Sequence, residues 1–254
     1  MIRKLRAIWL VTALLFTAIV STTPDSRADA SKPQVHVVSF GLWGLNALFQ
    51  REAKAAAEVV AAHYGKTGQI IVRANTPKHT SARIGNVRSV FEGLASTIDT
   101  ENDIVVVFFT SHGSKNGLGV ATNDSRRIFD LSPGQLSGML TANRIRNKVI
   151  IVSACYSGVF SDLIADPHTL VITAADADHT SFGCNDDNKG NYTYFGEAFF
   201  GESFKPGVDI TEAFKRARSS VSAREAAEKL PNSNPQMQGG EAILPKLSKL
   251  TKAN

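Results

Sequence analysis

The sequence predicts an α/β fold with a mainly parallel central sheet between two layers of helices. Two observations predict this fold. Apolar, β-branched strand segments alternate with helical segments along the chain. Several of these strand segments are apolar at nearly every position, so they lack the polar face of a half-exposed strand. Strands that are buried on both faces and separated by helices are typical of a parallel sheet covered on both sides.

The first half of the chain supplies three of the strands and two helices. QVHVVSF at 34–40 predicts the first strand, and the alanine-rich segment 45–64 has helical spacing. QIIVRA at 69–74 predicts a second strand, and residues 81–98 predict a second helix. The third strand is DIVVVFFT at 103–110, which is too apolar to have a face in water.

The second half continues the alternation. Residues 132–143 predict a helix with Pro133 at its first position, where proline is tolerated because no helical N–H is lost. Two more buried strands are expected over 148–154 and 169–175, and a long amphipathic helix over 210–230. No internal repeat and no linker divides this pattern into two domains.

Residues 1–30 have the composition of a secretory signal peptide. Basic residues at the start precede an apolar run of fourteen residues over 7–20, and the small residues of ADA at 28–30 suit cleavage. A membrane-spanning helix needs about twenty apolar residues, so we expect no stable membrane anchor after cleavage. The sequence therefore predicts a periplasmic or secreted protein with a single domain over 31–254.

Charge and cysteine content exclude two classes of protein. The chain of 254 residues has a net charge of +5, but the predicted signal carries four basic and two acidic residues, which leaves +3. So small an excess of positive charge does not indicate a nucleic-acid-binding surface. Two cysteines do not make a disulfide scaffold. Cys184 is expected to be a buried thiol, and a disulfide between Cys155 and Cys184 is an alternative.

Two of the predicted strands end on residues that can do chemistry. The strand 103–110 continues into Ser-His-Gly, with His112 and Gly113, and the strand 148–154 continues into Cys155. In parallel sheets, ligands and reacting groups gather at the carboxyl ends of the strands. One loop and one helix separate these two strands, so they are expected to be neighbours, with their ends at the same edge.

A cysteine beside a histidine suits nucleophilic catalysis. The thiolate attacks a carbonyl carbon, and the imidazole takes and returns the proton. The backbone N–H groups of Gly113 and Cys155 are candidate donors to the oxyanion, since glycine has no Cβ to block a close approach. A buried core thiol and an ordinary His-Gly turn are the structural alternatives for Cys155 and His112 taken singly. Their pairing at neighbouring strand ends favours catalysis.

These motifs resemble those of the legumain (asparaginyl endopeptidase) family of cysteine peptidases, and of its bacterial branch in particular. The resemblance rests on Ser-His-Gly after one strand, ACYSG after the next, and then TAADADHTSFGC, YFGEAFF and SNPQ in that order. It implies a caspase-like three-layer sandwich with a mainly parallel, roughly six-stranded central sheet. It also implies a catalytic dyad of His112 and Cys155 and an oxyanion site at Gly113 and Cys155. It also implies a peptide or protein substrate, with no metal and no organic cofactor.

The resemblance extends to the specificity pocket only in part. It implies substrate contacts from Thr180, Ser181 and Glu197. However, Tyr156 follows the cysteine where legumains have an acid, and the segment 40–44 lacks their Arg-His pair. Asparagine preference is therefore not assured, because an acidic pocket without its basic partner equally suits lysine or arginine.

Two other functions remain open on the sequence alone. A transpeptidase or transamidase would use the same acyl-enzyme and pass it to an amine. A non-catalytic periplasmic binding protein would use the same α/β scaffold without reacting.

Three loop segments have compositions that suggest further sites, but their spacing does not fit. Residues 176–179, DADH, match no structural zinc spacing, so no metal site is expected. The acidic segment 185–191 lacks the register of a calcium loop and is expected to be a flexible surface loop near the pocket. The glycine-rich segment 113–119 fits no phosphate-binding spacing and is expected to be a mobile loop behind the histidine.

Overall fold

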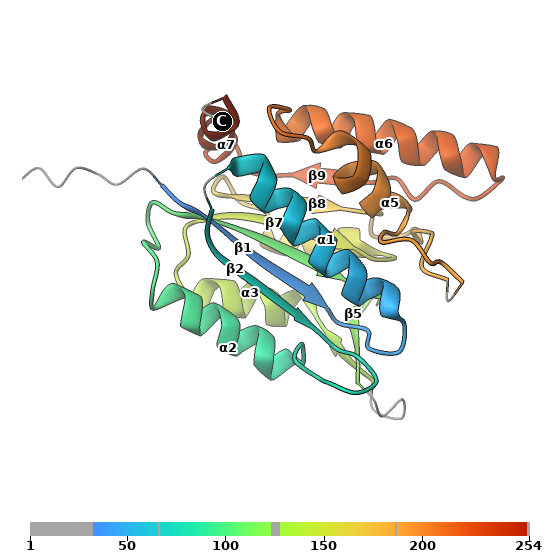
Figure 1. The fold of residues 1–254 in the computed structure, drawn as a ribbon, viewed down its shortest axis with the longest axis horizontal. Coiled ribbons are helices and arrows are strands. Elements are labelled where there is room, and N and C mark those ends of the chain that lie inside the picture. Colours follow the sequence, from blue (N-terminus) through green and yellow to red (C-terminus); the bar gives the residue numbers. More distant parts are fainter. Residues whose placement is uncertain (1–32, 66, 123–127, 186, 253–254) are drawn as a thin grey trace, which may run out of the picture. The chain divides into compact units, whose positions relative to one another are not determined.

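The central sheet of the protein has six strands, and the first five in spatial order run parallel (Figure 1). The computed structural model describes residues 33–65, 67–122, 128–185 and 187–252. The predicted signal peptide over 1–30 lies outside the described residues. The strand order is β2-β1-β3-β7-β8-β9. Its strands are β1 (Val35–Gly41), β2 (Thr67–Ala74), β3 (Ile104–Thr110), β7 (Asn147–Ser153), β8 (Thr169–Thr173) and β9 (Gln236–Gln238).

Helices cover both faces of this sheet, which confirms the predicted three-layer arrangement (Figure 1). One face carries α1 (Ala47–Tyr64), α5 (Tyr194–Gly196), α6 (Ile210–Ala227) and α7 (Leu244–Lys252). The π-helix Glu197–Ser203 continues directly from α5.

The opposite face carries α2 (Ile84–Ala95), α3 (Pro133–Ala142) and α4 (Ser161–Ile164), the last preceded by a 3₁₀ turn over Ser157–Phe160. Of the helices in the described ranges, none is long and apolar enough to cross a membrane.

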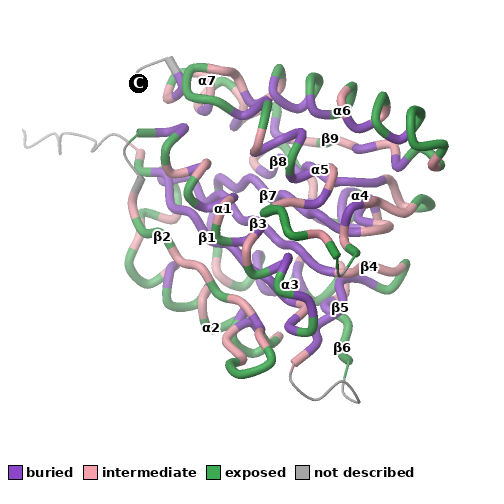
Figure 2. Tube along the Cα trace, turned by 45° about the vertical axis from the view of Figure 1, so that its right-hand side comes forward, coloured by how far each residue is buried: buried purple, intermediate pink, exposed green. Residues whose placement is uncertain are grey.

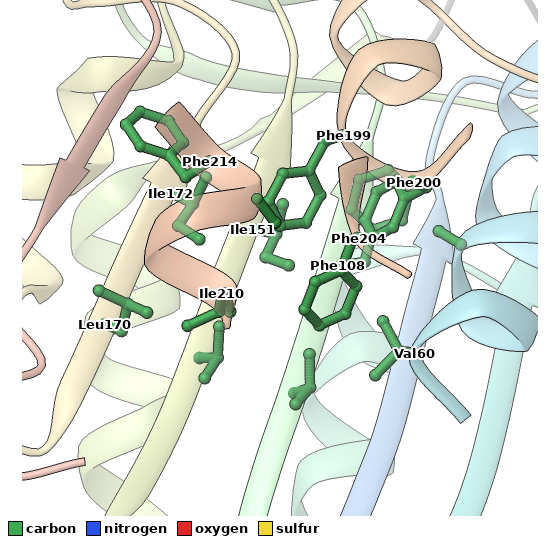
Figure 3. Close-up of a cluster of buried hydrophobic side chains, with 14 of the residues drawn as sticks. Val60, Phe108, Ile151, Leu170, Ile172, Phe199, Phe200, Phe204, Ile210 and Phe214 are labelled. Carbon is green, nitrogen blue, oxygen red and sulfur yellow. The ribbon is translucent and has the colours of Figure 1, made fainter. Parts of the chain in front are cut away.

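Alternating side chains of each central strand fill two separate cores. In β3, Phe108 packs among the aromatic residues below α1 and the π-helix, with its ring centroid 5.0 Å from that of Phe200 (Figure 3). Phe109 points to the other face and stacks on Phe40, at 5.1 Å. Burial on both faces explains why these strands are apolar throughout, and Figure 2 shows the central strands buried along their length.

A small antiparallel sheet stands where the sequence predicted a mobile loop over 113–119, and that prediction is wrong. The sheet consists of β4 (Gly113–Ser114), β5 (Gly117–Ala121) and β6 (Ile128–Leu131). Every residue of β5 is buried, whereas most of β6 is exposed (Figure 2). Burial of Leu118 and Val120 in the core explains the order of this segment, which its glycine content concealed.

Candidate active site

The carboxyl ends of β3 and β7 lie side by side. Thr110, the last residue of β3, pairs with Ser153, the last residue of β7. The pairing continues beyond the strands, because the Ser111 N–H donates to the Ser153 carbonyl at 3.3 Å. The segments that carry His112 and Cys155 therefore leave the sheet next to each other, as the order of motifs predicted.

Gly113 is the point where these two segments touch. A Cβ atom at this position would lie 2.0 Å from the carbonyl oxygen of Cys155 and 3.1 Å from the Cβ of Ala154. Real Cβ atoms do not approach a carbonyl oxygen so closely, so the backbone contact requires glycine here.

Two aromatic rings hold His112 edge-on. The ring centroids of Trp43 and Phe49 lie 4.8 Å and 5.0 Å from that of His112, with interplanar angles of 89° and 74°. The His112 carbonyl accepts a hydrogen bond from the Gly119 N–H at 2.9 Å. The half-buried imidazole thus sits between a strand hairpin and the segment after β1. Sequence reasoning missed both aromatic residues; the available signal was a tryptophan in the short Gly-Leu-Trp-Gly segment at the end of a strand.

The thiol of Cys155 is half-buried and lies against the segment 176–184. Its Sγ is 3.4 Å from the carbonyl oxygen of Ser181 and 3.9 Å from the Ser181 hydroxyl. Tyr156 follows in the left-handed conformation, with φ of 54°, and its N–H donates to the His179 carbonyl at 2.8 Å. This turn directs the chain away from the sheet immediately after the cysteine, so Sγ stays at the sheet edge.

Cys184 also lies close to the histidine. Its Sγ lies 3.8 Å from Nδ1 of His112, and its carbonyl accepts from the Asn46 side chain at 3.1 Å. Asn46 also caps α1, since its Oδ1 accepts from the Leu48 N–H. Cys184 is half-buried and so more accessible than predicted, and it forms no disulfide with Cys155 in this structure.

Comparison with known proteins identifies the family. The sequence model of the peptidase C13 family matches residues 72–248, more than half of the chain. The chain belongs to the peptidase C13 family. This is the legumain family of cysteine peptidases, and the protein is accordingly a cysteine endopeptidase.

The fold agrees with this assignment. The crystal structure of caspase-1 from Spodoptera frugiperda is similar at a TM-score of 0.55 and 12% sequence identity, over 82% of this chain and 86% of that chain. At this identity the likeness shows the fold, which is caspase-like, as predicted. No curated protein sequence matches the chain.

The three predicted pocket residues of this C13 peptidase lie at different points. Ser181 contacts Cys155, and Thr180 beside it is half-buried. Glu197 is the first residue of the π-helix and lines a polar pocket of 380 Å³, together with Gly183, Tyr194 and others. Gly183 belongs to the segment that contacts Cys155, so this segment connects the thiol and the pocket.

Glu197 pairs with a basic residue, whereas the sequence predicted an acidic pocket without a basic partner. Its carboxylate pairs with the Arg224 guanidinium of α6 at 3.0 Å. The same guanidinium lies 3.4 Å over the ring of Tyr194 and also pairs with Glu228. The hydrogen bonds from Tyr194 and Arg224 hold the pKa of the Glu228 carboxyl below its usual value. The sequence missed Arg224 because it lies 27 residues from Glu197 on a separate helix.

The loop over 187–191 is tied to the rest of the peptidase at both ends. The side chain of Asn188 donates to the carbonyls of Gly183 and Tyr192, at 2.7 and 2.9 Å. Arg51 of α1 donates to two carbonyls of the same loop. These bonds connect the described part of the predicted loop to α1 and to Gly183, and they hold one wall of the polar pocket.

The acidic and histidine side chains of the DADH segment do not form a metal site. Within the described ranges, no three side chains among histidine, cysteine, aspartate and glutamate converge to hold a metal ion. His179 and Asp176 of the DADH segment instead pair with each other at 2.7 Å, and Asp176 accepts from Asn234.

Proposed function

We propose that the peptidase hydrolyses peptide bonds through a dyad of Cys155 and His112. The observation that carries this proposal is the contact at Gly113, which brings the His112 segment against the Cys155 backbone at the sheet edge. A thiol and an imidazole on adjacent segments, both partly open to solvent, are the groups that covalent acyl transfer needs.

In the proposed reaction, His112 takes the thiol proton and the Cys155 sulfur attacks the carbonyl carbon of the substrate. A C–S bond forms and the electron pair of the carbonyl moves to the oxygen. When the C–N bond breaks, His112 gives its proton to the leaving amine. Water then attacks the thioester carbon while His112 accepts one of its protons. The C–S bond breaks, His112 returns the proton to the sulfur, and the carboxylic acid is released with the free thiol restored.

Two backbone N–H groups are proposed to stabilise the oxyanion. The hydrogen bond between Gly119 and His112 puts Gly113 at a non-hydrogen-bonded position of the β4–β5 ladder. Its N–H therefore points away from β5. Among the described residues, the Cys155 N–H has no hydrogen-bond acceptor. Both donors are thus available to a developing negative charge at the dyad.

We propose Thr180, Ser181 and Glu197 as specificity residues, with Arg224 as an addition. A guanidinium that donates and a carboxylate that accepts are together complementary to a side-chain carboxamide. The pair therefore supports preference for asparagine or glutamine over lysine or arginine.

The Arg224→Ala variant tests this assignment. Loss of the guanidinium frees the Glu197 carboxylate, so kcat/KM for peptides with lysine at P1 should rise relative to asparagine peptides by about tenfold. The matched control is Arg216→Ala on the same helix, which removes only the surface pair with Glu212. If Arg224→Ala left the preference for the P1 residue unchanged, Glu197 would not be a specificity residue.

A peptide library tests the proposed activity as a whole. The purified protein is incubated with the library, with and without glycinamide as acceptor amine, and products are read by mass spectrometry. We expect internal cleavage with free carboxyl ends in both samples. Products ligated to glycinamide in place of hydrolysis would show a transpeptidase, and binding without cleavage would show a non-catalytic protein.

Export is proposed on the sequence alone. The signal-like composition of 1–30 supports a periplasmic or secreted location. N-terminal sequencing of the protein recovered outside the cytoplasm should find Ser31 first.

A further inference from the structure

A buried carboxyl group lies at the ends of the two strands that lead to the proposed dyad. Glu52, on α1, has no exposed surface. Its Oε2 accepts from the Thr110 hydroxyl, and its Oε1 accepts from the Thr193 N–H at 3.0 Å and the Thr193 hydroxyl at 2.8 Å. The Ser153 hydroxyl lies 3.5 Å from Oε1 and 2.9 Å from the Thr193 hydroxyl.

The partners of Glu52 are the residues from which the site segments leave the fold. Thr110 ends β3, two residues before His112, and Ser153 ends β7, two residues before Cys155. Thr193 caps α5, the helix that leads to Glu197. One carboxyl group therefore joins the two strand ends to the segment that carries the proposed pocket acid.

Neighbouring residues pack closely around this carboxyl. A Cβ atom at Gly196 would lie 2.0 Å from Oε1 of Glu52, so the chain approaches the carboxyl as only glycine can. In the described part of the chain, no lysine, arginine or histidine pairs with Glu52, and hydrogen bonds alone satisfy it. Burial raises the pKa of this carboxyl, and the bonds from Thr110, Thr193 and Ser153 oppose that rise.

We propose that Glu52 is a positioning residue that sets the separation and orientation of Cys155 and His112. By holding Thr110, Ser153 and Thr193 at one point, it fixes where both segments leave the sheet. Glu52 does not touch the reacting atoms; it acts through the two strand ends. The inference rests on the proposed dyad, because a positioning role has meaning only if the two side chains react together.

Kinetics of Glu52 variants test the proposal. Glu52→Ala should lower kcat about 100-fold at nearly unchanged KM, since displacing a reacting group by about 1 Å costs that much. Glu52→Gln should stay within about tenfold of wild type, because its amide oxygen still accepts from Thr193 and its NH₂ donates to the Thr110 hydroxyl. Glu58→Gln, an exposed acid on the same helix, is the control that should change nothing.

A second readout separates positioning from stability. The rate at which iodoacetamide alkylates Cys155 is measured against pH, below the unfolding temperature of each variant. Glu52→Ala should alkylate more slowly at neutral pH than wild type, because a displaced imidazole no longer stabilises the thiolate. A purely structural role would lower the unfolding temperature and leave both kcat and this profile unchanged.

If Glu52→Ala does not fold, a second pair of variants tests the positioning role. Thr110→Val keeps the volume and suits a strand but removes the hydroxyl, whereas Thr110→Ser keeps it. We expect a lower kcat in Thr110→Val alone. Wild-type kcat in folded Glu52→Ala or in Thr110→Val, while Cys155→Ala is inactive, would overturn the positioning role and leave the dyad intact. Activity in Cys155→Ala would overturn the dyad itself.

Discussion

Replacing Cys155 with alanine is expected to reduce peptide hydrolysis by at least about 10⁴-fold, because the sulfur proposed to form the thioester is lost. The methyl group removes the bond-forming sulfur and little else. The thiol is only half-buried, and within the described ranges its side-chain hydrogen-bond partners are the Ser181 carbonyl at 3.4 Å and the Ser181 hydroxyl at 3.9 Å. The fold should therefore persist, with the same circular dichroism and an unfolding temperature near that of wild type.

Cys184 supplies the comparison for this variant. Its sulfur is the second thiol near the site and lies 3.8 Å from Nδ1 of His112. Cys184→Ala should lose less than about tenfold in kcat/KM, because the imidazole keeps its aromatic neighbours and its segment keeps the backbone contact at Gly113. If Cys184→Ala were inactive and Cys155→Ala active, the nucleophile would have been assigned to the wrong cysteine.

Replacing Gly113 with alanine should produce the second largest loss, about 10²- to 10³-fold in kcat, as for removal of one oxyanion donor. The new Cβ would lie 2.0 Å from the Cys155 carbonyl oxygen, so the two segments must separate. Separation moves the imidazole away from the thiol and displaces the Gly113 N–H. Neither change is expected to prevent folding, since the strands below remain paired.

The control for this variant is a glycine with free space around it. Gly134 lies in the first turn of α3. Apart from its chain neighbours and the helix's own backbone, a Cβ atom there would meet no atom of the described residues within 4 Å, so Gly134→Ala should keep full activity. Steady-state kinetics on the peptide that is cleaved best in the library provide the comparison. A Gly113→Ala enzyme with wild-type kcat would mean that the contact at Gly113 does not hold the site together.

The strands of the central sheet were predictable because burial on both faces leaves a clear record in the sequence. DIVVVFFT is apolar at every position between its first and last residues, and the structure confirms β3 within one residue. By contrast, the sequence over Gln236–Gln238 shows no apolar pattern. Three residues with glutamine at both ends are too few to show the alternation of a strand, so β9 was missed. The short hairpin after His112 was missed because its glycines indicate a loop.

The proposed dyad was predictable for a topological reason. In a parallel sheet, two consecutive buried strands that end on histidine and cysteine bring those residues to one edge, whatever their other neighbours are. The supporting contacts were not predictable in this way. Glu52 lies 58 residues from Thr110 and 101 residues from Ser153, and nothing local in the helix marks it as a buried carboxyl. Such residues become visible only when packing brings α1 onto the sheet.

The most direct test of the central claim is the site of covalent labelling by a peptidyl acyloxymethyl ketone. The folded protein is treated with this reagent, digested and mapped by tandem mass spectrometry. We predict a single adduct on Cys155, formed much more slowly in His112→Ala and absent after prior denaturation. An adduct on Cys184 instead, or hydrolysis that continues after Cys155 is fully labelled, would contradict the account.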